Sequence, residues 1–234
     1  MTPSALAAQG ASWGEALDRE GYAIIPGLID AATCAGVAAL YDGDDARFRK
    51  TVSMQGHGYG RGEYRYFANP LPEVVKTLRE TLYPSLARIA GTWAERLGPA
   101  RQWPASLAGL SAQCAAAGQT RPTPLLLKYG PGDYNRLHQD VYGALVFPLQ
   151  VIVLLDAPGR DFTGGELILT EGRAWMQSRP IVVPIQQGDG AVIPVRERPL
   201  AGARGWVKAA MRHGVSEVRS GRRRTLGIIF HDAA

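Results

Sequence analysis

Three side chains in the second half of the chain have the types and the spacing of a metal site. His138 and Asp140 are separated by one residue, and alternation along an extended segment points both to one side while Gln139 points away. His213 lies on a separate predicted strand further along the chain. Two imidazoles and one carboxylate on octahedral iron leave three positions open for a cosubstrate and oxygen. We therefore predict that His138, Asp140 and His213 are the metal ligands and the catalytic residues.

Three consecutive arginines stand at the head of the last predicted strand: Arg222, Arg223 and Arg224. Arginine suits the distal carboxylate of a chelating oxo-acid, because its planar fork binds a carboxylate bidentately and keeps its charge. We choose Arg223, since alternation places it on the same face as Thr225 and Gly227, where small residues leave room for a ligand. Arg224 is the second choice.

The chain from about Pro122 to Asp232 resembles the Fe(II)/2-oxoglutarate-dependent dioxygenases, whose jelly-roll core carries an H-x-D…H triad followed by a basic residue. The segments 127–132 (LKYGPG) and 137–140 (LHQD) are similar to the corresponding stretch of the AlkB-like alkylation-repair enzymes, where a tyrosine at the Tyr129 position touches 2-oxoglutarate. That branch has an asparagine where this chain has Leu127 and a second arginine where it has Ile229.

Other features resemble the prolyl-hydroxylase branch of the same superfamily. The chain has Gly164-Gly165-Glu166 entering a predicted strand, and ten residues separate His213 from Arg223. The overall pattern is similar to a small bacterial group of 2-oxoglutarate/Fe(II) oxygenases of undefined substrate.

The resemblance implies both the cofactors and the reaction. Fe(II) would be held by the triad, 2-oxoglutarate would chelate the metal, and oxygen would be the cosubstrate. The enzyme would hydroxylate a C–H bond of its substrate and release succinate and CO2. The residues expected at the distal carboxylate of 2-oxoglutarate are Arg223 and Tyr129, with Thr225 beside them.

The pattern of apolar residues predicts a mostly β fold with some α structure. Short β-type runs separated by Gly and Pro occupy residues 124–129, 147–155, 165–170, 181–185, 191–195, 206–213 and 225–230. Closely spaced short strands are typical of a jelly roll. We expect a double-stranded β-helix core over residues 122–234, supported by an N-terminal α/β region over residues 1–121, as one compact unit.

The N-terminal region carries the signals of several helices and one short strand. Ser12 and Glu15 have capping-box spacing, Tyr22 to Pro26 is strand-like, and Asp30 can cap the next helix. Apolar residues recur at helical spacing over residues 71–97, and Pro84 is expected to split this run into two helices.

Residues 42–71 lack periodicity and are rich in Gly, Arg and Tyr, which predicts a loop. Cations interleaved with aromatic rings can neutralise phosphates and stack on unpaired bases. One interpretation is therefore a lid that contacts nucleotides through Arg61, Tyr64 and Arg65; the other is a mobile surface loop whose charges serve solubility. We expect His57 to be a polar residue of this lid and His231 to cap the last strand, both outside the triad.

The charge distribution indicates either a polyanionic partner or anionic substrate, or a surface that mixes solvated charges. The formal net charge is +5, and the basic residues gather in two regions, 47–67 and 196–224. The preferred substrate class is alkylated nucleic acid, single-stranded or with the damaged base flipped out, which would be oxidatively demethylated. The alternatives are a hydroxylase of protein side chains such as proline, or of a small molecule, and a metal-binding jelly-roll module without turnover.

The remaining expectations concern location and partners. No run of apolar residues reaches the length of a membrane span, and no signal segment opens the chain, so we expect a cytoplasmic protein without a membrane partner. The two cysteines, Cys34 and Cys114, are interpreted as small core residues. Nothing in the sequence indicates an obligate protein partner.

Overall fold

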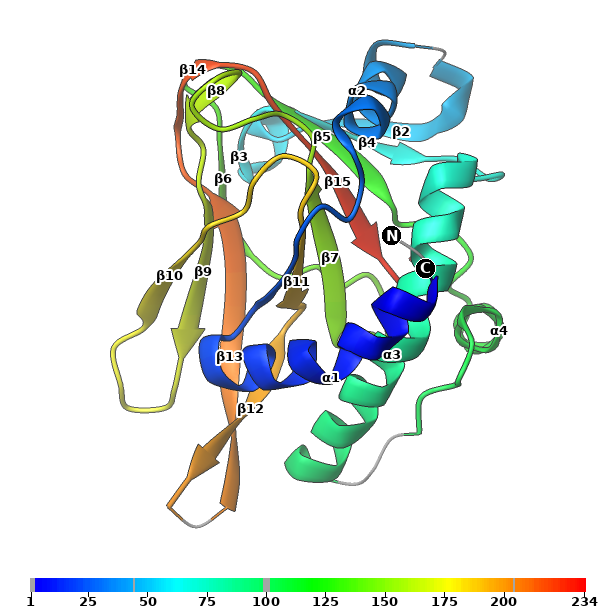
Figure 1. The fold of residues 1–234 in the computed structure, drawn as a ribbon, viewed down its shortest axis with the longest axis vertical. Helices are drawn as coiled ribbons and strands as arrows, with labels where there is room; N and C mark the ends of the chain where they lie inside the picture. The colour runs from blue at the N-terminus through cyan, green and yellow to red at the C-terminus, as the bar shows by residue number, and fades with distance from the viewer. Residues whose placement is uncertain (1–2, 44, 99–101, 204) are drawn as a thin grey trace.

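Two antiparallel β-sheets form the centre of the protein (Figure 1). The computed structural model describes residues 3–43, 45–98, 102–203 and 205–234. The larger sheet has seven strands in the order β1 (Ala23–Ile25), β11 (Gly190–Pro194), β7 (Leu149–Leu154), β15 (Arg223–Ile229), β5 (Leu125–Tyr129), β4 (Glu63–Phe67) and β2 (Phe48–Ser53).

The smaller sheet has six strands. Five of them form one row of hydrogen-bonded neighbours, and the sixth pairs with one strand of that row. Its order is β10 (Arg179–Val183), β9 (Leu167–Gly172), β13 (Gly205–Val215), β6 (Tyr134–His138) and β3 (Gly60–Arg61), and β12 (Glu197–Gly202) also pairs with β13. A separate two-stranded sheet pairs β8 (Phe162–Gly164) with β14 (Val218–Gly221).

The chain passes back and forth between the two large sheets from β5 onward. Strands β5, β7, β11 and β15 belong to the larger sheet, whereas β6, β9, β10 and β13 belong to the smaller one. This alternation is the topology of a double-stranded β-helix, so the predicted fold class is confirmed. The predicted β-type runs correspond to β5, β7, β9, β10, β11, β13 and β15, while β6, β8, β12 and β14 lie outside these runs.

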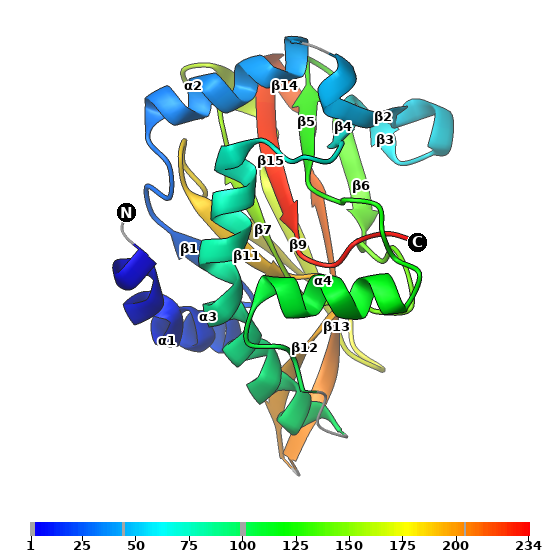
Figure 2. The same cartoon turned by 90° about the vertical axis from the view of Figure 1, so that its right-hand side faces the viewer.

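Helices cover the outer face of the larger sheet (Figure 2). They are α1 (Pro3–Glu20), α2 (Ala31–Ala39), α3 (Glu73–Leu97) and α4 (Leu107–Ala116). Elsewhere the chain forms the short 3-10 helices η1 (Leu40–Asp42), η2 (Asp45–Arg47) and η3 (Gln55–His57). Leu82 and Leu86 of α3 share one buried cluster with Val151 of β7 and Ile228 of β15. None of the helices in the described residues is long and apolar enough to cross a membrane.

Pro84 lies inside α3, so the predicted split into two helices is wrong. Leu82 and Leu86, which lie two residues before and two residues after it, are fully buried against the sheet. A proline inside a helix removes one backbone hydrogen bond and crowds the preceding turn, which costs about 3 kcal/mol. Apolar burial along both halves of the helix exceeds this cost and keeps α3 continuous.

The two predicted helix starts have different outcomes. Ser12 and Glu15 lie within α1, which begins at Pro3, so the capping-box prediction is wrong. Asp30 caps α2 as predicted, because its carboxylate accepts a hydrogen bond of 2.7 Å from the backbone N–H of Thr33.

Residues 42–71 do not form the predicted aperiodic loop. Strands β2 and β4 pair with each other, and β4 pairs with β5, so this hairpin widens the larger sheet by two strands. Strand β3 joins β6 at the edge of the smaller sheet. Gly60 and Gly62 adopt φ angles of 134° and 118°, and these positive-φ turns interrupt the alternation by which a strand is recognised in sequence.

A buried ion pair ties α1 to the smaller sheet. The guanidinium of Arg198, on β12, donates to Glu171 of β9 through Nε at 2.9 Å. Its Nη1 donates to the carbonyls of Leu17 and Asp18 at the end of α1, at 3.0 and 2.8 Å. Arg198 is 1% exposed, so these partners satisfy a charge that water does not reach.

We predict that Glu171→Gln lowers the free energy of unfolding by about 3–5 kcal/mol, because it leaves the Arg198 charge buried without its counterion. Urea unfolding followed by circular dichroism measures this change. The control is Glu197→Gln, which removes an exposed pair with Lys208 at 3.1 Å and is expected to cost at most about 1 kcal/mol. Equal effects of the two substitutions would contradict the prediction.

Candidate active site

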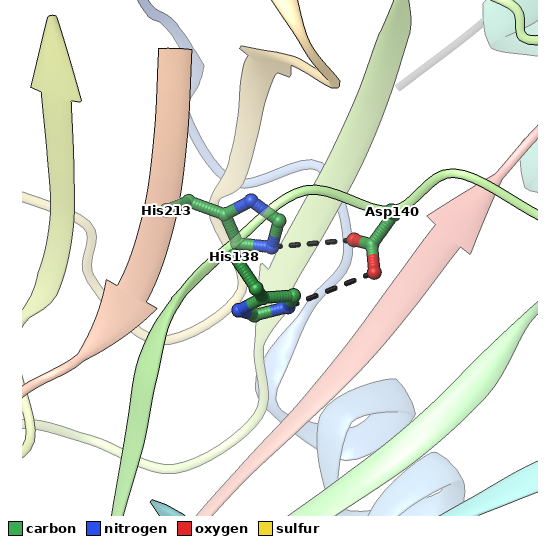
Figure 3. A group of neighbouring side chains, drawn as sticks. All are labelled: His138, Asp140 and His213. Atoms are coloured by element: carbon green, nitrogen blue, oxygen red, sulfur yellow. Dashed lines mark ion pairs between the residues drawn. The ribbon is translucent and has the colours of Figure 1, made fainter. Parts of the chain in front are cut away.

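The three predicted metal ligands meet between the two sheets (Figure 3). His138 ends β6 and pairs directly with His213 of β13, so the two imidazoles lie side by side. Asp140 follows β6 by two residues. Its Oδ1 lies 3.6 Å from Nε2 of His138, and its Oδ2 lies 3.2 Å from Nε2 of His213. The structure therefore brings the three side chains together on one face, as the alternation argument requires.

The donor atoms of this triad fit a single metal ion. All three ligand atoms lie within 4.8 Å of one another, and this is the one such group of His, Cys, Asp or Glu in the described residues. Adjacent ligands at about 2.1 Å from one ion are separated by about 3 Å, which is close to the separations seen here. Two imidazoles and one carboxylate suit Fe(II) with open coordination positions.

The protonation states of His138 and Asp140 suit the binding of a cation. Nδ1 of His138 lies 2.8 Å from the carbonyl of Arg136; a carbonyl only accepts, so Nδ1 carries the proton and Nε2 keeps its lone pair for a metal. Burial and the neighbouring His213 lower the pKa of His138. Burial raises the pKa of Asp140, but His213, His138 and Tyr142 outweigh it and hold the pKa well below its usual range.

Tyr142 supports the carboxylate of the triad. Its hydroxyl donates to Oδ1 of Asp140 at 2.7 Å. Burial raises the pKa of Tyr142 well above its usual value, so the phenol keeps the proton that it donates. The ring packs edge to face against Tyr66, with centroids 6.1 Å apart. Sequence reasoning missed Tyr142, because the residues after His138 lie outside the strands and no alternation marks the direction of their side chains.

Arg223 is buried, and no ion pair reaches it from the described residues. It is 1% exposed, and its Nε and Nη1 have no hydrogen-bond partner in the part of the chain that the structure describes. Its guanidinium carbon lies 5.5 Å from the ring centroid of Tyr129. Burial lowers the pKa of Arg223 and raises that of Tyr129 to about 12. A buried guanidinium whose N–H groups have no hydrogen-bond partner is suited to bind an anion.

The chain around Arg223 leaves space for its long side chain. Gly165 has a φ of 64°, and a Cβ at this position would lie 2.9 Å from Cδ of Arg223. Thr225 is 2% exposed and lies on the same face of β15 as Arg223, so both line the interior cavity. Gly165 thus makes room for a candidate cosubstrate residue, whereas Gly164 lies against the carbonyl of Glu217, and Glu166 is exposed and bonded to Ser216.

The two neighbouring arginines have other surroundings. Arg224 points to the opposite face of β15, where its Nη2 and Nε donate to the carboxylate of Asp156 at 2.6 and 3.0 Å. Arg222 is exposed. Of the three arginines, only Arg223 lines the cavity, which is what the choice of Arg223 requires.

A cavity of about 490 Å³ contains the triad, Arg223 and Thr225. Tyr64 and Tyr66 of β4 line it, and Tyr59 and Arg136 stand at exposed positions of the same wall. The cavity is thus deep and largely aromatic on one side, with a cation at its edge.

The three residues of the expected lid do not act as one surface. Tyr64 lines the cavity, and Arg61 is exposed on β3 at the edge of the smaller sheet. Arg65 points to the other face of β4, where its guanidinium carbon lies 5.1 Å from the ring centroid of Tyr41 and 5.3 Å from that of Phe48. The expectation for Arg65 is therefore corrected: in a strand, neighbouring residues face opposite sides.

The other two histidines lie outside the triad, as expected. His57 is exposed and stacks on Tyr59, with ring centroids 5.5 Å apart. His231 is buried just after β15, and its Nδ1 accepts a hydrogen bond of 3.3 Å from the backbone N–H of Phe147. Burial lowers the pKa of His231 to about 4, so it is neutral at physiological pH.

Solved structures share this fold. The chain is 14% identical to a Pseudomonas putida prolyl-4-hydroxylase, with a TM-score of 0.53 over 96% of this chain and 99% of that one. It is 18% identical to an oxidoreductase of the 2OG-Fe(II) oxygenase family from Burkholderia pseudomallei, with a TM-score of 0.55 over 96% and 92% of the two chains. At this identity the likeness concerns the fold. Together with the triad and the family match below, it defines an oxidoreductase of the 2-oxoglutarate/Fe(II) oxygenase superfamily, which uses Fe(II), 2-oxoglutarate and O2.

Within that superfamily the chain belongs to the Oxygenase-NA family, whose model matches residues 62–233. The family is described as "Oxygenase, catalysing oxidative methylation of damaged DNA". The chain is also 48% identical, over 193 residues, to uncharacterised proteins of two Mycobacterium tuberculosis strains, Rv2227 and MT2286. The match covers 80% of this chain and 82% of each relative.

We predict that Tyr142→Phe weakens metal binding by about 10- to 100-fold, because Asp140 loses the hydrogen bond that orients it. Titration of the apoprotein with Mn(II) or Co(II), followed by spectroscopy, measures this change. Tyr59→Phe is the matched control, since its side chain is half exposed at the same cavity and makes no contact with a candidate ligand. If both variants bind the metal like the wild-type protein, Tyr142 does not position the carboxylate.

Proposed function

We propose that the protein is an Fe(II)- and 2-oxoglutarate-dependent dioxygenase that oxidatively demethylates alkylated nucleic acid. The family description, which names damaged DNA, is the observation that carries this proposal. Oxidation of an N-methyl group gives an N-hydroxymethyl group. Its C–N bond then breaks and formaldehyde leaves, while the nitrogen of the base keeps the electron pair. The hydroxyl proton goes to that nitrogen in a neutral adduct and to solvent in a cationic one.

The proposed roles of the residues follow from their positions. Nε2 of His138, a carboxylate oxygen of Asp140 and Nε2 of His213 would hold Fe(II). Arg223 would bind the distal carboxylate of 2-oxoglutarate with its unused Nε and Nη1 donors, with the Tyr129 ring beside it. The iron and its cosubstrate supply the oxidising chemistry when bound. The protein excludes water from the cavity and keeps Asp140 ionised.

The mouth of the cavity supports a nucleic-acid substrate. The ring of Tyr64 lies inside, and half-exposed Tyr59 and exposed Arg136 lie at the edge. Aromatic rings stack on unpaired bases, and arginines neutralise phosphates. A base within a duplex cannot enter a cavity between two sheets, so the preferred substrate is single-stranded or has the damaged base flipped out.

We predict that Arg223→Ala weakens 2-oxoglutarate binding by about 10- to 100-fold, because it removes two charge-assisted hydrogen bonds. Arg222→Ala and Arg224→Ala are the controls on the same strand end, and each is expected to change the affinity by less than about 3-fold, because neither side chain lines the cavity. Titration of the Fe(II)-loaded protein under anaerobic conditions measures the affinity. A larger loss in the Arg224 variant would assign the role to that arginine instead.

We predict that methylated single-stranded DNA stimulates succinate formation and that formaldehyde appears in equal amount. The assay contains Fe(II), 2-oxoglutarate and oxygen, with unmethylated DNA, methylated RNA, a proline-rich peptide and free amino acids as the other arms. His138→Ala should abolish both products. Stimulation by the peptide or the amino acids alone would reject the nucleic-acid proposal and favour a hydroxylase.

A further inference from the structure

Gln150 is a buried polar residue on the wall of the same cavity. Along β7 the side chains alternate: Leu149 and Val151 join the cluster under the helices, whereas Gln150 and Ile152 line the cavity between the sheets. Gln150 is 2% exposed. Its amide therefore faces the interior that also contains the triad, and it does not face solvent.

The amide nitrogen of Gln150 has no hydrogen-bond partner in the part of the chain that the structure describes. A second buried glutamine, Gln119, shows how such a group is normally satisfied. Gln119 is 1% exposed, and its Nε2 donates to the carbonyls of Leu145 and Asp232 at 2.9 and 2.6 Å. A buried donor without a partner is costly to folding, so Gln150 has the character of a group that a ligand completes.

The position of Gln150 separates it from the proposed cosubstrate site. Gln150 pairs with Ile229 on β15, six residues beyond Arg223 on the same strand. Six residues of strand span about 20 Å, so the two side chains line different ends of the cavity. Ile229 packs in one cluster with Tyr66 and Tyr142, and these two rings, which meet edge to face, line the same cavity as Gln150.

We propose that Gln150 is a specificity-determining residue that donates a hydrogen bond from its amide to a carbonyl oxygen of the base being demethylated. This inference rests on the proposed function. In 3-methylcytosine and 3-methylthymine, a carbonyl group adjoins the methylated nitrogen. In 1-methyladenine, that nitrogen lies between a C–H and an exocyclic amino group, and neither accepts a hydrogen bond there. An unpaired donor therefore selects the methylated pyrimidines.

The test uses Gln150→Met, which keeps the length of the side chain and removes the donor. Two readouts are made on single-stranded oligonucleotides with one 3-methylcytosine or one 1-methyladenine: formaldehyde release, and binding to anaerobic protein loaded with Mn(II) and 2-oxoglutarate. We expect the wild-type protein to prefer 3-methylcytosine, and the variant to lose about 10-fold on that base while changing less than about 2-fold on 1-methyladenine. Gln113→Leu, at an exposed position of α4, is the control and should behave like the wild type.

Thermal unfolding distinguishes this role from a structural one. Removal of a buried, unsatisfied donor should leave Tm unchanged or raise it, whereas loss of a structural hydrogen bond would lower it. A lowered Tm, an unchanged preference in Gln150→Met, or a wild-type protein that treats both bases alike would each overturn the inference while leaving demethylation intact. If the wild-type protein releases no formaldehyde from any methylated oligonucleotide, the proposed function fails, and this inference fails with it.

Discussion

The candidate site depends on one register between two strands. His213 of β13 stands directly opposite His138 of β6, and β13 is held on its other side by β9, where His213 pairs with Leu169. A slip of one residue would turn an imidazole to the opposite face of the sheet and separate the two histidines. The backbone hydrogen bonds of the smaller sheet thus fix the spacing of the candidate ligands before any metal binds.

The larger sheet uses the same alternation for a different purpose. On β15, Leu226 and Ile228 pack under the helices, while Arg223 and Thr225 line the cavity. The triad is carried by the smaller sheet and the buried guanidinium by the larger one, so the packing of the two sheets sets the space between them. The helical layer seals the outer face of the larger sheet and needs no part in the chemistry.

Much of this arrangement follows from the sequence, because the alternation of strands acts over a few residues. That rule alone places His138 beside Asp140 and separates Arg223 from Arg224, whereas the addition of His213 to the triad also used the ligand chemistry of iron and the resemblance to the dioxygenases. Continuity of α3 through Pro84 and the sheet pairing of residues 42–71 depend on tertiary packing, which no local pattern records. Tyr142 and Gln150 were missed for a related reason. The hydrogen bond from Tyr142 to Asp140, and the unpaired amide nitrogen of Gln150 among the described residues, are visible only when the strands are assembled.

The contact between Arg198 and the end of α1 crosses the boundary of the family match. The family match begins at residue 62, after α1, β1 and α2. However, the carbonyls of Leu17 and Asp18 help to satisfy a guanidinium that lies on β12, beside the strand that carries His213. A fragment cut at the family boundary would expose this charge network and the helix-covered edge of the larger sheet. The first helix is therefore part of the scaffold of the site, although it contributes no residue to it.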